Sequence, residues 1–474
     1  MAKENIVGRV KEQELLREFM ASNRAEFIAI YGRRRIGKTY LVKQFFDEQF
    51  DFYVTGIYDK SKREQLANFN RQLNKYSGAY YPVVDNWFDA FAQLKHYLER
   101  IQDKPRIVVF MDELPWMDTP RSKFLRALEL FWNEWASGRP NMKFIVCGSA
   151  TTWMTNKLLG DKGGLHNRVT RPIRLRSFTL AETEQYLLMQ GFQPDRLQML
   201  EGYMVLGGTP FYLSMLRPQY SIQQNIDDLF FAEAAPLREE YSFLFRSLFN
   251  DAPKYRRIIE LLATKVKGMT KQEIISSLKI DDNGNLTEVL DNLCKCDFLR
   301  RYNAVGKKER DVMYQLIDLY SLFYNRYVMN DHSQDPHRWS HMLNDGSRKA
   351  WSGYAFEQVC LSHVEQIKRK LNIDGILSDV GSWQTQGAQI DLVIQRSDRI
   401  INLCEMKYSD KPYSVTKSYL TKMAERRELF RQETKSTKAL HLTIVSPFGI
   451  KENAQSKSIQ SVVTLDDLFC EDRG

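Results

Sequence analysis

The stretch FIAIYGRRRIGKTYLVKQFF, residues 27–46, decides the fold of the first part of the chain. Its apolar start, residues 27–31, predicts a buried strand, and the spacing of apolar residues from Lys38 onward predicts an amphipathic helix. The loop between them, GRRRIGKT, matches the phosphate-loop pattern GxxxxGK followed by Ser or Thr at every fixed position. A strand, this loop and a helix in succession predict a site for nucleotide phosphates.

The chemistry of a phosphate loop explains these residue types. Glycines permit the torsions that turn N–H groups toward a phosphate, the lysine can reach the β and γ oxygens, and the threonine hydroxyl can bind Mg²⁺. We therefore expect a nucleotide with Mg²⁺ to be bound by Gly32, Arg33, Arg34, Arg35, Ile36, Gly37, Lys38 and Thr39. The role of the three arginines stays open, because they can also lie in solvent and only raise the local positive potential.

Two later apolar runs end in polar residues. Residues 106–114, RIVVFMDEL, predict a strand that ends in Asp112, to hold the magnesium shell, and Glu113, to polarise an attacking water. The alternative is a plain buried strand with an acidic end, which the upstream loop makes the weaker interpretation. Residues 143–151, KFIVCGSAT, predict a third strand that ends near Ser149.

These segments, together with IVGRVKEQELL (residues 6–16) and GGTPFYL (residues 207–213), resemble the archaeal-type ATPase family. That family is a branch of the signal-transducing (STAND) P-loop ATPases related to AAA+, and the resemblance covers roughly the first half of the chain. It implies an ATP-binding switch that hydrolyses ATP slowly. It also implies an ATPase domain over residues 1–178 and a helical lid over residues 179–245.

The same resemblance assigns roles to two further residues. Ser149 stands where AAA+ ATPases keep a polar sensor of the γ-phosphate, and Pro210 belongs to an element expected near the nucleotide base. The basic segment after the third strand contains Arg168 and Arg171, either of which can act as an arginine finger, and a solvated basic loop is the alternative for each; Arg168 is our preferred candidate. A finger that acts across a subunit boundary would make a second copy of the chain a partner, so the expectation includes a homo-oligomer.

Residues 246–330 are predicted to form a winged helix, with helices followed by two strands, FLRRY and VMYQLID, that flank a wing. TKQE (residues 270–273) and NLTE (residues 285–288) each look like a capping box at a helix start. The candidate recognition helix, residues 285–296, carries one lysine against two acids, so we expect no sequence-specific reading of DNA by it. Wing residues Lys307, Lys308 and Arg310 can contact phosphates.

Residues 331–350 are polar and turn-rich, which predicts a linker, and residues 351–474 are predicted to form a further domain. The expected elements of that domain are a helix near 351–371, strands near 376–383, 390–394 and 401–407, a helix near 417–430 and a strand at 439–446. The element order is therefore αβββαβ.

The hairpin QIDLVIQRSDRIINLCEMKYS, residues 389–409, carries candidate chemistry. A turn centred on Asp398 pairs Val393 with Leu403 and sets Asp391 opposite Glu405. Lys407 then lies on the same face as Glu405, because side chains alternate along a strand. Opposed carboxylates repel each other unless a cation lies between them or one takes up a proton, and a divalent metal is the natural resolution.

Asp391, Glu405 and Lys407 resemble the D…ExK core of the PD-(D/E)XK nuclease superfamily, with Glu357 as the accessory acid. The resemblance implies a restriction-endonuclease-like fold, Mg²⁺ or Mn²⁺ held by Glu357, Asp391 and Glu405, and Lys407 as the residue that orients or activates the attacking water. The alternative is a hairpin with Glu–Lys salt bridges and no chemistry, in a domain that binds without cutting.

Length, charge and hydropathy limit the number of domains and the kinds of partner that we expect. A chain of 474 residues suggests three or four domains, and a net charge of +9 is compatible with nucleic acid without requiring it. No apolar run approaches the roughly 20 residues of a membrane span, so we expect no membrane partner and a cytoplasmic protein. The favoured function is a multidomain α/β ATPase switch that controls a nuclease-like domain acting on nucleic acid, first of all DNA. The alternatives are a regulatory or scaffolding ATPase and a DNA-translocating or loading ATPase.

Overall fold

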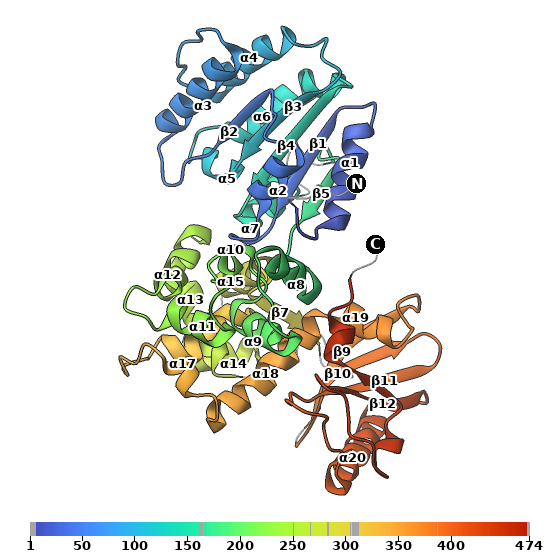
Figure 1. Ribbon diagram of the computed structural model, residues 1–474. Helices are drawn as coiled ribbons and strands as arrows, with labels where there is room; N and C mark the ends of the chain where they lie inside the picture. The colour runs from blue at the N-terminus through green and yellow to red at the C-terminus, as the bar shows by residue number, and fades with distance from the viewer. Residues whose placement is uncertain are drawn as a thin grey trace. The chain divides into compact units, whose positions relative to one another are not determined.

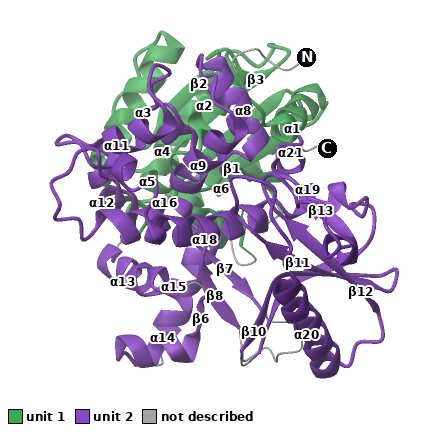
Figure 2. Ribbon diagram, turned by 60° about the horizontal axis from the view of Figure 1, so that its bottom comes forward, with its two compact units in different colours: residues 1–176, 247–249, 474 green, residues 177–246, 250–473 purple. Residues whose placement is uncertain are grey.

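The computed structural model describes residues 6–471 except 161–164, 166, 250, 266, 282–283, 304, 306–311 and 386. The chain divides into two compact units (Figure 2). The first runs to Arg176 and includes residues 247–249, and the second holds the other described residues from Ser177 onward. The wing residues Lys307, Lys308 and Arg310 lie outside the described residues.

The first unit is built on a parallel sheet with strand order β2-β3-β4-β1-β5 (Figure 1). Its strands are β1 (Glu26–Tyr31), β2 (Phe52–Thr55), β3 (Ile107–Asp112), β4 (Met142–Gly148) and β5 (Arg171–Arg174). Its helices include α1 (Val10–Ala21), α2 (Lys38–Phe45), α3 (Lys62–Ser77), α4 (Trp87–Glu99), α5 (Leu114–Met117), α6 (Phe124–Glu134) and α7 (Thr151–Trp153).

Apolar cores cover both faces of this sheet. Because side chains alternate along a strand, Phe27 and Ala29 of β1 belong to the core with α3, α4 and α6, whereas Ile28 and Ile30 belong to the core with α1 and α2. The expectation of a multidomain α/β protein with a parallel-sheet P-loop core is confirmed.

The second unit begins with a helical region. Its helices are α8 (Leu180–Met189), α9 (Arg196–Leu206), α10 (Pro210–Leu213), α11 (Ile222–Phe230) and α12 (Pro236–Leu248). There follow α13 (Ala252–Ala263), β6 (Met269–Thr270), α14 (Lys271–Leu278), α15 (Gly284–Lys295), β7 (Leu299–Tyr302) and β8 (Met313–Leu316), whose strands form an antiparallel sheet of order β6-β8-β7.

One of the two predicted capping boxes is present. The Thr270 side chain accepts from the Glu273 backbone, and the Glu273 carboxylate accepts in return from the Thr270 backbone, so α14 begins as predicted. The second prediction is wrong, because α15 begins at Gly284 and Asn285 already lies in its first turn. A helical residue has no free cap position, so the NLTE pattern marks helix interior there.

The predicted linker, residues 331–350, is folded. It contains α17 (Arg338–His341) and the first turn of α18 (Gly346–Ser362), and it follows the helical turns α16 (Leu319–Phe323) and η4 (Tyr324–Val328). Trp339 is 2% exposed and contacts the rings of Phe323, Tyr327 and Trp351. Burial of one large aromatic side chain among others outweighs the polar, turn-rich composition around it, and the linker prediction is corrected accordingly.

The last part of the chain forms a sheet of order β13-β12-β11-β10-β9. The elements are α19 (Val364–Lys370), β9 (Ser378–Thr385), β10 (Ala388–Arg396), β11 (Ile400–Met406), α20 (Lys417–Thr434), β12 (Ala439–Val445), β13 (Ser461–Val463) and α21 (Leu465–Leu468). The predicted order of a helix, three strands, a helix and a strand is present, although α18 and α19 replace one helix. The predicted hairpin register is confirmed, since Val393 pairs with Leu403.

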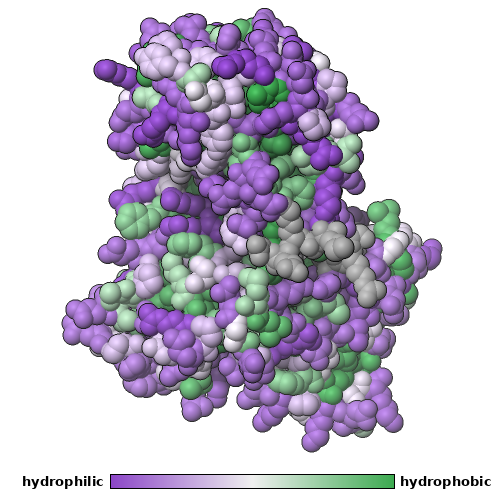
Figure 3. Space-filling model, turned by 45° about the horizontal axis from the view of Figure 1, so that its top comes forward, coloured by the Kyte–Doolittle hydropathy of each residue, from purple (hydrophilic) through white to green (hydrophobic). Residues whose placement is uncertain are grey.

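The surface is that of a protein with mixed polarity. Figure 3 shows hydrophilic side chains over much of the face in view, with hydrophobic ones in smaller groups among them. Within the part of the chain that the structure describes, no helix combines the length and the apolar character needed to cross a membrane.

The folded state of residues 331–350 can be tested at Asp227, which is 2% exposed and accepts a hydrogen bond of 2.8 Å from the backbone of Trp339. Asp227→Ala leaves buried donors unpaired, and we expect the free energy of unfolding to fall by about 1–3 kcal/mol, measured by urea denaturation. The control is Asp228→Ala, whose carboxylate is 33% exposed and lies 3.5 Å from Arg217. Equal unfolding midpoints for the two variants would contradict the packed arrangement.

Candidate functional site

The loop between β1 and α2 has the backbone that a phosphate loop requires. Gly32 has φ +148, and a Cβ added there would lie 2.2 Å from the carbonyl oxygen of Leu175, so only glycine fits. Gly37 has φ +86 and caps α2 in the left-handed region that glycine adopts without strain. The free N–H groups of the first turn of α2 therefore follow directly on the loop.

Lys38 lies within this loop. Its side chain is buried, and its Nζ donates to the carbonyl oxygens of Gly32 at 3.0 Å and Arg33 at 2.9 Å. Burial lowers the pKa of Lys38, because a charged ammonium is less stable away from water. The ammonium group is therefore held by loop carbonyls at the place where the prediction puts the phosphates.

Thr39 and Asp112 meet although they are far apart in the sequence. Thr39 Oγ1 donates to Asp112 Oδ2 at 2.9 Å, and Thr55 Oγ1 donates to the same oxygen at 3.1 Å. Burial, with a contribution from the charge of Glu113, raises the pKa of Asp112 to about 6. A hydroxyl and a carboxylate side by side are the hard oxygen donors that Mg²⁺ prefers, so these residues fit the predicted ion.

Glu113 and Ser149 are also brought together, from the ends of neighbouring strands β3 and β4. Glu113 Oε2 accepts from the Ser149 backbone at 3.0 Å and from its Oγ at 2.7 Å. Glu113 has φ +47, a conformation that costs free energy outside glycine and that turns the chain sharply after β3. Both side chains therefore lie at the strand ends where the prediction puts the water and the γ-phosphate.

The arginines around the loop differ in exposure. Arg33 is 5% exposed, so the alternative of a solvated side chain is wrong for it, whereas Arg34 and Arg35 are partly exposed. Arg9 is buried and donates from Nη2 to the carbonyl oxygen of Ile36 at 3.3 Å. Arg9 belongs to the segment IVGRVKEQELL that carries the family resemblance, but no contact was predicted for it, because nothing in a local pattern indicates which loop a distant arginine contacts.

Two predicted nucleotide contacts remain predictions. Arg168 lies in the first unit with an exposed side chain, in the segment before β5. Pro210 is the first residue of α10 in the second unit.

The four predicted residues of the last domain form one charged cluster. Lys407 Nζ lies 3.3 Å from Glu405 Oε2, as predicted for side chains on one face, and Asp391 Oδ2 accepts from the backbone of Met406 at 3.2 Å. Burial and the charge of Glu405 raise the pKa of Asp391 to about 6. Burial and the charge of Asp391 raise the pKa of Glu357 to about 8. The carboxyl groups are therefore within electrostatic reach of one another.

A residue that the sequence analysis missed supplies a second positive charge to this cluster. Arg426 of α20 donates from Nη1 to both oxygens of Glu405, at 2.9 and 3.0 Å. Glu405 is 3% exposed, so its carboxylate is held by Arg426 and Lys407 away from bulk water. Among the described residues, no group of three or more His, Cys, Asp or Glu side chains is arranged to hold a metal ion.

In this arrangement the Glu405 carboxylate is paired with the Arg426 guanidinium and the Lys407 ammonium. The metal-ligand set of Glu357, Asp391 and Glu405 stays a prediction. No local pattern indicates Arg426, because a helix residue reaches a strand only through the packing of the two elements.

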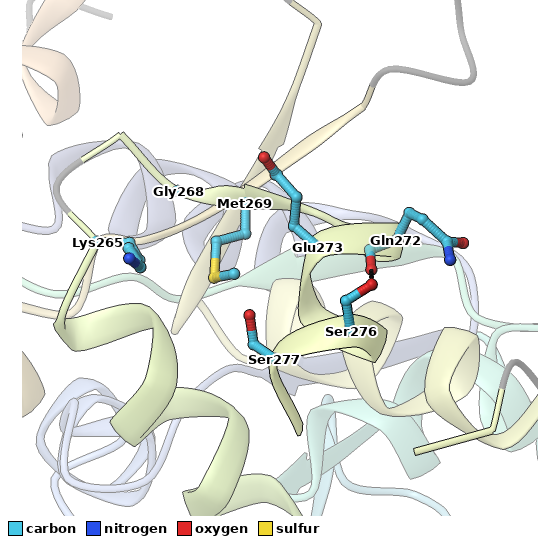
Figure 4. Close-up of a pocket in the computed structure, with 7 residues that line it drawn as sticks. All are labelled: Lys265, Gly268, Met269, Gln272, Glu273, Ser276 and Ser277. Atoms are coloured by element: carbon cyan, nitrogen blue, oxygen red, sulfur yellow. Dashed lines mark hydrogen bonds between the residues drawn. The ribbon is translucent and has the colours of Figure 1, made fainter. Parts of the chain in front are cut away.

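A surface hollow lies elsewhere in the second unit, beside the start of α14 (Figure 4). Its lining residues are Lys265, Gly268, Met269, Gln272, Glu273, Ser276 and Ser277. Two of the polar groups are already engaged, since Glu273 caps α14 and Ser276 donates to the Gln272 carbonyl at 3.0 Å. None of the predicted site residues lines this hollow.

Comparison with protein families gives two matches. Residues 6–216 match a model described as an ATPase domain predominantly from Archaea, and residues 324–427 match one described as archaeal and bacterial proteins of unknown function. The first match contains every predicted nucleotide residue. It supports an ATPase domain in the first part of the chain.

Individual relatives are distant. An uncharacterized protein of Methanocaldococcus jannaschii is 24% identical over 443 residues, which cover 90% of this chain and 91% of that protein. An uncharacterized ATP-binding protein of the same organism is 44% identical over 43 residues, which cover 9% of this chain and 73% of that protein.

Solved structures align more loosely. The Walker-type ATPase of Pyrococcus abyssi aligns with a TM-score of 0.49 and 16% identity, over 69% of this chain and 97% of that chain. Cdc6p of Pyrobaculum aerophilum aligns with a TM-score of 0.32 and 14% identity, over 68% of this chain and 95% of that chain.

The Arg426 contact generates a direct prediction. Arg426→Ala removes the main counter-charge of Glu405, so we expect Mn²⁺ to bind the protein several-fold more tightly than it binds the wild type, measured by electron paramagnetic resonance without nucleotide. Arg427→Ala is the matched control, because it removes the same charge from the next position of α20. If both variants bind Mn²⁺ as the wild type does, Arg426 does not exclude the ion.

Proposed function

We propose that this protein is a switch ATPase that binds and hydrolyses ATP in its first unit and acts on nucleic acid through its last domain. The hydrogen bond between Thr39 and Asp112 carries the first half of this proposal. It sets a hydroxyl and a carboxylate side by side at the foot of α2, which is the donor set that a magnesium nucleotide requires.

The residues have distinct tasks in this proposal. Bound Mg²⁺ neutralises charge on the β and γ phosphates. Loop N–H groups and Lys38 hold the phosphates, and Glu113 accepts a proton from the attacking water, with Ser149 orienting its carboxylate. Arg168 is the candidate finger that a second copy of the chain would supply.

Glu113→Gln tests the hydrolytic role. The amide keeps an oxygen for Ser149 but accepts no proton, so we expect ATP turnover to fall by about 10²–10⁴-fold, with ATP affinity nearly unchanged. Turnover is measured by phosphate release and affinity by calorimetry. The control is Glu134→Gln on the exposed end of α6, and Lys38→Ala should abolish ATP binding itself. Unchanged turnover in Glu113→Gln would falsify the assignment of the base.

For the second half of the proposal, residues 246–330 form a winged helix that packs as part of the switch, and the last domain is a nuclease-like domain that acts first of all on DNA. Glu357, Asp391, Glu405 and Lys407 lie in one cluster on α18, β10 and the end of β11, which supports a site inherited from a nuclease fold. Cations at the same place, Lys407 and Arg426, suit a phosphate backbone.

A second candidate is a regulatory or scaffolding ATPase whose last domain binds DNA or a protein partner without cutting. The contact between Arg426 and Glu405 favours it, because the carboxylate is already neutralised by a guanidinium group. Both candidate functions include the ATPase switch. They differ in whether the last domain cleaves nucleic acid.

Cleavage assays separate the candidates. With Mg²⁺ or Mn²⁺ and ATP, we expect the wild type to cut single- or double-stranded DNA, and we expect Asp391→Ala and Lys407→Ala each to abolish cutting while ATP binding persists. The control is Asp398→Ala at the hairpin turn, whose carboxylate pairs with Arg396 at the surface. A wild type that retains DNA in filter binding but never cuts it or RNA supports the second candidate.

A further inference from the structure

A hydrogen bond joins the helical region to the strand end that carries Lys407. Tyr408 follows Lys407 directly, and its Oη donates to Oε1 of Glu201 on α9 at 3.0 Å. Burial and the charge of Glu201 raise the pKa of Tyr408, so the hydroxyl keeps its proton and stays a donor. The ring of Tyr408 also contacts Phe356 of α18, with centroids 5.9 Å apart.

Glu201 is itself held in a packed polar network. Gln223 of α11 donates to its other oxygen, and the guanidinium of Arg348 lies 3.8 Å from that oxygen. Arg348 is 4% exposed, donates to the Trp339 carbonyl at 2.7 Å and lies over the Trp339 ring at 4.0 Å. Gln223 and Arg348 both hold the Glu201 carboxylate in place. A displacement of α9 therefore moves this acceptor of the Tyr408 hydrogen bond, because the Glu201 side chain is not free to stay behind.

The C-terminal part of α9, just beyond Glu201, is fixed to the point where the chain enters the second unit. Tyr203 Oη donates to the carbonyl oxygen of Phe178 at 2.8 Å, and the Phe178 N–H donates to the carbonyl oxygen of Gly208 at 2.8 Å. A Cβ at Gly208 would lie 2.3 Å from that Phe178 carbonyl oxygen, so the backbones approach as closely as glycine allows. Phe178 therefore moves with α9.

Three residues before Phe178, the chain touches the phosphate loop. The Leu175 N–H donates to the carbonyl oxygen of Tyr31 at 2.8 Å, and the Leu175 carbonyl lies against Gly32. The first glycine of the phosphate loop is thus joined to α9 by the short segment from Leu175 to Phe178, whose two ends are both hydrogen-bonded. This four-residue segment is the covalent path along which a change at the phosphate loop can reach α9.

We propose that Glu201 and Tyr408 are positioning residues that couple the nucleotide state of the phosphate loop to the placement of Lys407. The inference rests on the proposed ATP site but not on DNA cleavage. Lys407 is pinned on its other side, since its N–H donates to the Val445 carbonyl at 2.8 Å. A shift of Tyr408 therefore changes the direction of the Lys407 side chain relative to Glu405.

Hydrogen exchange of the full-length chain, read by mass spectrometry, tests the coupling. We expect AMP-PNP with Mg²⁺ to slow exchange in residues 32–45 and to change exchange in residues 404–411 of the wild type. In Tyr408→Phe the change in 404–411 should disappear while the protection of 32–45 remains. Tyr413→Phe is the matched control, since it removes a tyrosine hydroxyl five positions further along the chain without touching the Glu201 bond, and it should behave as the wild type does.

The possible outcomes distinguish the ATP site, the coupling and the nuclease proposal from one another. A wild type without any nucleotide effect in 404–411, or a Tyr408→Phe protein that keeps the whole effect, overturns the coupling. Glu201→Gln, which keeps the size of the side chain, should weaken the effect as Tyr408→Phe does if the hydrogen bond carries it. Absence of protection in 32–45 overturns the ATP site and the coupling with it, whereas failure to cut DNA overturns only the nuclease proposal.

Discussion

The nucleotide site depends on one constraint of topology: β1, β4 and β3 are parallel neighbours, so their carboxyl ends meet at the same edge of the sheet. Gly32, Ser149 and Asp112 stand at these three ends. The Thr39 hydroxyl then reaches Asp112 across the end of β4, over a sequence separation of 73 residues. Burial by the flanking helices raises the pKa of Asp112 and increases the benefit of a cation beside it.

In the last domain, buried carboxyl groups are stabilised by basic side chains. Several carboxyl groups are gathered where water is scarce, and a charge there must be paired or protonated. Arg426 and Lys407 pair with Glu405, and burial favours the protonated form of Glu357. A guanidinium group has a fixed fork of donors that suits a carboxylate, so it competes directly with any metal for the same oxygens.

The parts of the second unit are packed together by residues 331–350, which were predicted to be a linker. Trp339 is buried in an aromatic cluster, and Arg348 lies between it and Glu201. Because Asp227 of α11 also accepts from Trp339, the helical region and the segment before α18 pack as one body. In the coupling that we propose, this packed body carries a shift of α9 to the strand end at Tyr408.

The sequence by itself determined what repeats locally: the strand, loop and helix around Gly32, the capping box at Thr270, and the hairpin register that pairs Val393 with Leu403. These features follow from the period of a strand or helix and from glycine torsions, which a short stretch contains in full. The tertiary structure alone decided that Arg426 neutralises Glu405 and that Glu201 receives Tyr408, 207 positions away. Such contacts depend on how elements pack, and packing is a property of the whole chain because many distant side chains share the same buried space.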